Sequence, residues 1–319
     1  SARRNPVECR SHAKRKTLDF KMANDLVILG GTPPTTSTTP TAPATTFPPH
    51  LQAAVGAFVP GANVTFTPGA ARIADVVDTP ALRAAMGAFA QQHEVDTVLV
   101  DSHRRLTDFK LVAMDMDSTL ITIECIDEIA DYCGLKAEVS AITEAAMRGE
   151  IKDFNESLTR RVALLKGLDA SALEKVFDER LQLSPGAETM LRGVQALGIR
   201  TLLVSGGFTF FTERLKARLN LDVARANTLE IVDGKLTGRV LGEIVNAEVK
   251  ARTVTEVATH LGVSAAQAIV MGDGSNDLQM MAIAGLSVAF RAKPVVREKA
   301  SVALNYAGLD ALLSMFRKD

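Results

Sequence analysis

Two carboxylates stand one residue apart directly after an apolar run. Residues 110–114 have the composition of a buried β-strand, and Asp115, Asp117 and Ser118 follow it. In open α/β sheets, ligands bind just beyond the carboxyl ends of the strands, so aspartates at this point are placed for chemistry. The alternative is a pair of solvated turn aspartates, because Asp and Ser are ordinary turn residues.

Two further apolar runs end in polar residues of chemical interest. Residues 200–204 lead to Ser205 and Gly206, and residues 268–271 lead to Asp273 and, four residues later, Asp277. Carboxylates gathered at one sheet edge repel each other unless a cation lies among them. Mg²⁺ prefers oxygen ligands and keeps water and substrate phosphate oxygens in its coordination shell. The pattern therefore predicts magnesium and a phosphate group at one site.

The composition limits the class of protein. A length of 319 residues predicts two or three folding units, and the formal net charge of -1 gives no field that would attract nucleic acid or a membrane surface. No run of about 18 apolar residues is present, and the amino-terminal residues carry charges where a secretory signal needs an apolar centre. We therefore expect a cytoplasmic protein without nucleic-acid or membrane partners.

The first third of the chain predicts a small separate domain. Residues 1–21 are basic and lack periodicity, which favours a disordered extension. Residues 22–107 predict a β-α-β-β-α-β domain of ferredoxin-like type, with a Thr/Pro-rich loop at 32–49. This α+β domain resembles the amino-acid-binding ACT modules. It carries no specific binding signature, so a spacer, or a homodimer formed through this domain, is as well supported as a sensor.

The remaining chain predicts an α/β core interrupted by helices. Residues 108–122 and 184–319 alternate strand and helix patterns, as expected for a doubly wound parallel sheet. Between them, residues 123–183 have a helical pattern from 124 to about 180, with a break at Gly134. An insertion after the first catalytic strand is placed to cover the active site, so we expect a helical cap.

Four segments, in order over residues 111–290, resemble the motifs of the haloacid dehalogenase (HAD) superfamily of phosphohydrolases. Residues 115–119 resemble its first motif and residues 205–207 its second. Lys250 fits the third, although most helix lysines are simply solvated, and the Gly-Asp-Gly-Ser-Asn-Asp sequence at 272–277 fits the fourth. The fourth motif is the most specific of these matches.

The resemblance implies a mechanism and a role for each matched residue. Asp115 would attack phosphorus to form an aspartyl phosphate, and Asp117 would act as general acid and then as general base. Mg²⁺ would be held by Asp115, the backbone carbonyl of Asp117 and Asp273, with Asp277 as an orienting group behind them. The phosphoryl oxygens would be bound by Ser205, Gly206, Lys250 and Asn276, the last of which could equally be a local cap.

Within the superfamily, Glu124 and residues 146–162 most closely resemble the phosphoserine phosphatase family. There, the matching glutamate receives the substrate ammonium and the matching arginine, here Arg161, receives its carboxylate. Met147 and Phe154 would supply apolar walls. Each residue also has a simpler interpretation: a helix-start acid for Glu124, a surface cation for Arg161, and packing within the cap for Met147 and Phe154.

The leading hypothesis is a Mg²⁺-dependent phosphomonoesterase that hydrolyses L-phosphoserine to L-serine and phosphate, the last step of serine biosynthesis. One alternative keeps the chemistry but changes the substrate or acceptor, as in a HAD phosphatase or phosphotransferase acting on another small phosphomonoester. Another is an amino-acid-sensing regulator. The combination of Asp115, Asp117, Lys250 and Asp273 favours an enzyme, because a protein that only binds needs no acid beside a nucleophile.

Overall fold

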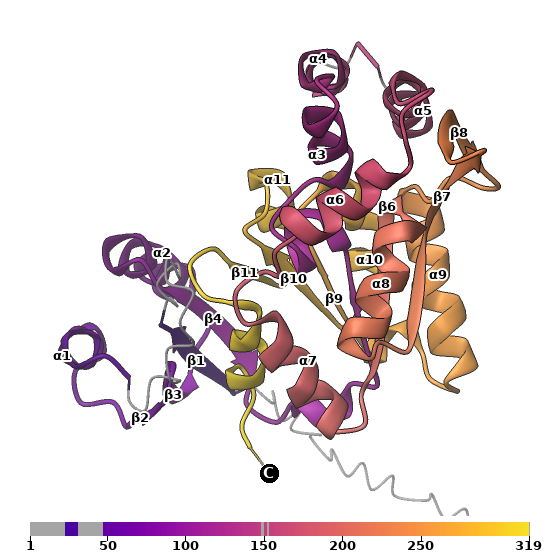
Figure 1. The fold of residues 1–319 in the computed structure, drawn as a ribbon. Helices are drawn as coiled ribbons and strands as arrows, with labels where there is room; N and C mark the ends of the chain where they lie inside the picture. The colour runs from indigo at the N-terminus through magenta and orange to yellow at the C-terminus, as the bar shows by residue number, and fades with distance from the viewer. Residues whose placement is uncertain (1–22, 31–46, 148–149, 152, 319) are drawn as a thin grey trace, which may run out of the picture.

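The computed structural model describes residues 23–30, 47–147, 150–151 and 153–318 (Figure 1). The predicted extension at 1–21 and most of the predicted loop at 32–49 lie outside these residues. Within the described part of the chain, no helix is long and apolar enough to cross a membrane.

The larger sheet contains, among the described residues, seven strands in the order β11-β10-β9-β5-β6-β7-β8. All neighbours pair in parallel except β7 and β8, which form an antiparallel hairpin. The predicted parallel α/β sheet is therefore confirmed, although the short β11 was not identified from the sequence. The strands are β5 (Leu111–Met114), β6 (Arg200–Phe208), β7 (Val223–Val232), β8 (Lys235–Leu241), β9 (Ala268–Gly272), β10 (Leu286–Phe290) and β11 (Val302–Leu304).

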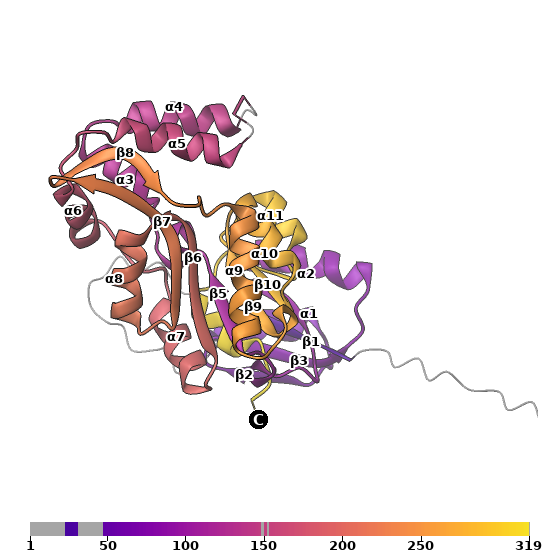
Figure 2. The ribbon, with the colours of Figure 1, turned by 90° about the vertical axis from the view of Figure 1, so that its right-hand side faces the viewer.

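Helices cover both faces of this sheet (Figure 2). On one face lie α7 (Ala187–Ala196) and α8 (Thr209–Leu219), and on the other α9 (Ala247–His260), α10 (Leu278–Ala282) and α11 (Pro294–Lys299). Along β5, Val112 and Met114 belong to the first core, whereas Leu111 and Ala113 belong to the second. Because successive side chains point to opposite faces and both faces are buried, the strand is apolar without interruption.

Between β5 and β6 along the chain, the described residues form four α-helices, which lie above the carboxyl edge of the sheet (Figure 1). They are α3 (Cys125–Tyr132), α4 (Lys136–Met147), α5 (Phe154–Leu164) and α6 (Ser171–Glu179). Gly134 follows α3 with φ of +74°, in agreement with the predicted break. Two backbone hydrogen bonds close the base of the insertion, from Thr122 N to Gln182 O and from Ser184 N to Leu120 O, both 2.9 Å. Its function as a cap stays a prediction.

The amino-terminal elements form a separate antiparallel sheet in the order β2-β3-β1-β4. They occur in the predicted β-α-β-β-α-β order: β1 (Asn24–Leu29), α1 (Pro49–Phe58), β2 (Val64–Thr67), β3 (Ala70–Val76), α2 (Pro80–His93) and β4 (Asp96–Asp101). The predicted loop ends earlier than expected, because Pro49 already begins α1 and Phe47 is buried. The likeness to amino-acid-binding modules is untested.

Two buried aspartates attach this smaller sheet to the end of the chain. The carboxylate of Asp96, at the start of β4, accepts hydrogen bonds from the backbone amides of Asn305, Tyr306 and Ala307 at 2.8, 3.1 and 2.8 Å. Asp25 on β1 is fully buried and pairs with the guanidinium of Arg317 at 2.7 Å. Both acids have partners for their charge, so their burial fixes the smaller sheet against the larger one.

Replacing Asp96 with Ala should lower the free energy of unfolding by about 3 kcal/mol, because three backbone amides lose a buried charged acceptor. Asp101→Ala is the matched control, since Asp101 ends the same strand and, among the described residues, its carboxylate accepts one hydrogen bond, from the exposed amide of His103. Urea titration of both variants checks this expectation. Equal losses of stability in the two variants would contradict it.

Candidate active site

The ammonium group of Lys250 lies between the carboxylates of Asp115 and Asp277, near the carboxyl edge of the sheet. Its Nζ is 2.7 Å from Asp115 Oδ2 and 2.8 Å from Asp277 Oδ1, and its side chain is fully buried. Asn246 caps α9 by accepting a hydrogen bond from Val249 N, which places Lys250 in the first turn of this helix. A buried charge is tolerated only when it is paired, so these three residues depend on one another.

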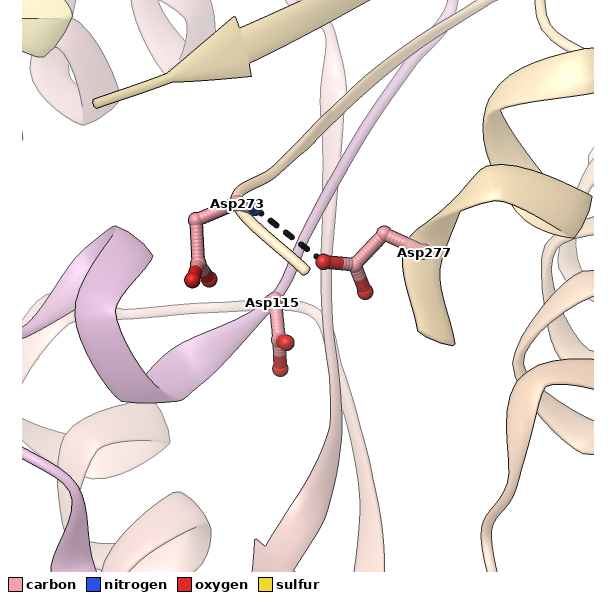
Figure 3. Close-up of side chains that lie close together, drawn as sticks. All are labelled: Asp115, Asp273 and Asp277. Carbon is pink, nitrogen blue, oxygen red and sulfur yellow. Dashed lines mark hydrogen bonds between the residues drawn. The ribbon is translucent and has the colours of Figure 1, made fainter. Parts of the chain in front are cut away.

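Three aspartates from neighbouring strand ends form one acidic cluster (Figure 3). Oxygen atoms of Asp115, Asp273 and Asp277 all lie within 4.8 Å of one another. Asp277 Oδ2 accepts hydrogen bonds from the amides of Asp273 and Gly274 at 3.1 and 3.0 Å, and Thr119 donates to Asp273 Oδ1 at 3.1 Å. The cluster lies at β5 and β9, where the chain crosses from one half of the sheet to the other.

The electrostatics of this cluster fit a divalent cation. Burial, followed by the charge of Asp277, holds the pKa of Asp115 well above its ordinary range, and the same two causes raise the pKa of Asp273 to about 6. Three carboxylates share one buried lysine, which leaves an excess of negative charge. A set of carboxylate oxygens with this excess suits Mg²⁺.

Asp117 lies outside the acidic cluster and beside the first turn of α3. Its Oδ1 accepts a hydrogen bond from Cys125 N at 3.2 Å. Burial and, second, the charge of Glu124 raise the pKa of Asp117 to about 7. Ser118, in the left-handed conformation with φ of 54°, donates its hydroxyl to Glu124 Oε1 at 2.7 Å. Asp117 can therefore hold or release a proton near neutral pH, as a general acid and base must.

Near its carboxyl end β6 is irregular, because residues 205–207, here called the 205–207 loop, leave its pairing with β7. Two glycines let this loop pack closely against its neighbours. Gly207 N donates to Ser205 Oγ at 2.8 Å. A Cβ added at Gly207 would lie 2.7 Å from Met116 Cε and 2.8 Å from Asp117 Oδ2. A Cβ at Gly206 would lie 2.9 Å from Phe154 Cζ, so this loop also contacts the helical insertion. Backbone groups can approach a ligand here only because no side chain intervenes.

A cavity of about 550 Å³ opens between the sheet edge and the helical insertion. Lys250 and Asp277 lie behind Asp115, and Met147 ends α4 but its side chain is not among the described parts of the structure. The structure thus brings together every predicted site residue whose side chain it describes, while their roles stay predictions. The predicted residues that line the cavity are Asp115, Asp117, Glu124, Phe154, Arg161, Ser205, Gly206, Asp273 and Asn276.

Several polar residues in or beside the cavity were missed from the sequence, among them Asp127, Lys293 and Asn227. Asp127 and Lys293 also line the cavity. Asp127 follows Glu124 by one helical turn, a spacing that places both on one helix face and was a usable signal. Its Oδ1 is buried and lacks a hydrogen-bond partner among the described residues. Asn227 gives no comparable signal, because both of its partners are backbone groups.

The sequence profile of the haloacid dehalogenase-like hydrolases matches residues 112–282, which include the whole acidic cluster. A phosphoserine phosphatase from a Polaromonas species is 56% identical over 217 residues, covering 67% of this chain and 92% of that protein. The chain belongs to the haloacid dehalogenase-like hydrolases. This hydrolase is an enzyme of the phosphoserine phosphatase branch.

Two solved structures resemble nearly the whole hydrolase, including its amino-terminal sheet. A HAD family hydrolase from Salmonella enterica serovar Typhi has a TM-score of 0.78 and 33% identity, covering 93% of this chain and 99% of its own. A probable phosphoserine phosphatase from Vibrio cholerae has a TM-score of 0.75 and 37% identity, covering 92% of this chain and 87% of its own. The combination of both sheets is therefore shared with these proteins.

The geometry of the loop predicts that Gly207→Ala will lower phosphatase activity of this hydrolase by roughly 100-fold or more, since a displaced oxyanion-type donor has an effect of this size. The added methyl group would displace Asp117 or Met116. Gly56→Ala in α1 is the control, because a Cβ there meets nothing within 4 Å. Turnover of an aryl phosphate and thermal unfolding, measured for both variants, decide the outcome. Full activity in the folded Gly207→Ala enzyme would refute the expectation.

Proposed function

We propose that this hydrolase is a Mg²⁺-dependent phosphoserine phosphatase that releases L-serine and phosphate, as the last step of serine biosynthesis. The observation that carries the proposal is the content of one cavity. The cavity that contains Asp115 and Asp117 is also lined by the carboxylate side chain of Glu124 and the guanidinium side chain of Arg161. L-Phosphoserine presents an ammonium, a carboxylate and a phosphate, so opposite charges beside a phosphoryl-transfer site match all three groups.

In the proposed reaction, an oxygen of Asp115 bonds to phosphorus while the bond from phosphorus to the serine oxygen breaks. Asp117 gives its proton to the departing serine oxygen. It then takes a proton from a water molecule whose oxygen bonds to phosphorus while the bond from phosphorus to Asp115 breaks. This releases inorganic phosphate and returns both aspartates to their starting states. Lys250 holds Asp115 at 2.7 Å, so the nucleophile is oriented before the substrate arrives.

The phosphoryl group would be met by groups from three segments. Ser205 and the Gly206 amide would bind its oxygens, together with Asn276 and the positive field of Lys250. Mg²⁺, when bound, supplies positive charge to the phosphoryl oxygens. Asp115, Asp273 and the backbone carbonyl of Asp117 would hold the metal, and Asp277 would orient them through its bonds to Lys250 and the amide of Asp273.

The serine end of the substrate would be recognised by the helical insertion, which would act as a cap. Burial lowers the pKa of Arg161, whereas the charges of Asp127 and Glu124 act in the opposite direction. A partly desolvated guanidinium gains more from a carboxylate ligand than one in water, because the local dielectric constant is lower. Phe154 and Met147 would form apolar walls that exclude water.

The amino-terminal sheet and the cellular location belong to the same proposal. A cytoplasmic enzyme agrees with Cys125 and Cys133, which are both free. The ferredoxin-like element order agrees with an ACT-like domain that mediates homodimerisation. Sedimentation of the intact protein tests the dimer, and a monomer at micromolar concentration would contradict it.

Phosphate release decides the proposed activity. We expect strong turnover of L-phosphoserine with Mg²⁺ and loss of at least about 100-fold after chelation, because the acidic cluster then lacks its countercharge. Turnover should return when Mg²⁺ is restored. An aryl phosphate and phosphothreonine at matched concentrations serve as comparison substrates. A preference for the aryl phosphate over phosphoserine would agree with the proposed phosphatase chemistry but would refute L-phosphoserine as the substrate.

Arg161→Ala should raise the KM for L-phosphoserine roughly 10- to 100-fold, since a bidentate charge-assisted contact is lost. The KM for phosphoethanolamine, which lacks the carboxylate, should stay nearly unchanged. Arg160→Ala is the matched control, because Arg160 is exposed and pairs with Glu156 one helical turn away. Steady-state kinetics on both substrates separate the outcomes. Unchanged phosphoserine turnover in Arg161→Ala would exclude the proposed role.

A further inference from the structure

The pairing of β6 with β7 skips residues at the phosphoryl-binding loop. Val204 pairs with Arg225, and the next pair is Phe208 with Asn227. Four steps along β6 thus correspond to two steps along β7. Residues 205–207 leave the hydrogen-bond ladder between the two strands, which frees their backbone groups but also removes the bonds that would fix them.

The side chain of Asn227 replaces those missing bonds. Its Nδ2 donates to Gly206 O at 2.7 Å, and its Oδ1 accepts from Val245 N at 2.8 Å. The residue is 1% exposed, so its carboxamide has little access to water. A buried amide with a partner at each end is held in one orientation. Asn227 is therefore a rigid connection between this loop and the segment before α9.

This connection fixes the peptide group between Gly206 and Gly207 at both ends. Its carbonyl oxygen is held by Asn227, and its N–H donates to Ser205 Oγ at 2.8 Å. Because the Ser205 oxygen accepts that hydrogen, its own hydroxyl hydrogen is directed elsewhere. The site for the phosphoryl group lies on the cavity side of Ser205 and Gly206. The orientation of the hydroxyl donor thus follows from a residue that lies outside the cavity lining.

The second partner of Asn227 leads to the lysine. Val245 precedes Asn246, the cap of α9, and Lys250 lies in the first turn of that helix. Asn246 also donates its Nδ2 to Asn155 Oδ1 at 3.2 Å, in the first turn of α5. Asn227 therefore lies where the loop of Ser205 meets the segment that positions Lys250.

We infer that Asn227 is a positioning residue for phosphoryl transfer, which sets the Ser205 hydroxyl and the Gly206 backbone relative to Lys250. The inference rests on the proposed phosphatase chemistry, not on the identity of the alcohol. Asn227 acts on the phosphoryl end of the site, so its removal affects every phosphomonoester alike. A residue that reads the serine end affects phosphoserine selectively.

The test replaces Asn227 with Asp and, more mildly, with Ser. Asp keeps an acceptor for Val245 N but presents an oxygen to Gly206 O, which should turn the peptide. The matched control is Thr201→Val. Thr201 is also buried in β6, but it lies at the end of the strand remote from the site. Its hydroxyl donates to Asp222 Oδ2 at 2.9 Å and accepts from Asp222 N at 3.1 Å. Thermal unfolding identifies a temperature at which all variants are folded.

For Asn227→Asp we expect kcat to fall roughly 10- to 100-fold, by the same factor for L-phosphoserine and an aryl phosphate, as for other residues that orient a contacting group. The inhibition constant of inorganic phosphate should rise about fivefold or more, since the same donors bind it. Asn227→Ser should show a smaller loss in the same pattern. Thr201→Val should stay within about twofold of the parent enzyme, because it leaves those donors in place.

Three results would overturn the inference: activity within about twofold of the parent in both folded Asn227 variants, a loss restricted to phosphoserine, or an equal loss in Thr201→Val. If Asn227→Asp does not fold, Asn227→Ser decides. Failure of the proposed function looks different, since the parent enzyme would then hydrolyse the aryl phosphate without favouring phosphoserine. The aryl phosphate series would still decide the role of Asn227.

Discussion

The buried ammonium of Lys250 is the interaction on which the site depends. It lies within 2.8 Å of carboxylates from two different segments, and its side chain has no access to water. At such distances in a poorly screened interior, the two acids would repel each other strongly without it. β5, α9 and the turn after β9 must therefore meet at one point. The caps and backbone bonds around them hold these segments in place.

The absence of a side chain at two glycines allows these segments to lie close together. A Cβ at Gly272 would lie 2.4 Å from Asp277 Oδ2, and one at Gly207 would lie 2.8 Å from Asp117 Oδ2. The carboxylates thus approach the backbone at positions where no side chain fits. This close packing also raises the pKa of Asp115 and Asp273, because burial removes water from groups that already repel one another. The same geometry that concentrates the acids creates the demand for a cation.

The charged part of the site could be read from the sequence, because apolar strands followed by acids have a strong pattern. Asp115, Asp117 and Asp273 were found in this way, whereas Lys250 lies on a helix and was identified only by its match to the third motif of the superfamily. Asn227 was not found, since its proposed role lies in hydrogen bonds to backbone groups of Gly206 and Val245 that no spacing reveals. The attachment of the smaller sheet through Asp96 was missed for the same reason, because its three partners are backbone amides about 210 residues away. Short β11 carries too few residues for a periodic signal.

Different parts of the chain would contact the two ends of the proposed substrate. The groups proposed to bind the phosphoryl end belong to the sheet edge, and those proposed for the serine end, Glu124 and Arg161, belong to the insertion that begins after β5. Near the site, the contacts between them include Phe154 against Gly206 and the hydrogen bond from Asn246 to Asn155. In the proposed function, the chemistry would depend on the buried Lys250 network, whereas the serine end would be recognised by residues that line the cavity. Substitutions on the insertion can therefore change which alcohol is released while the acidic cluster, its lysine and the Asn227 connection stay intact.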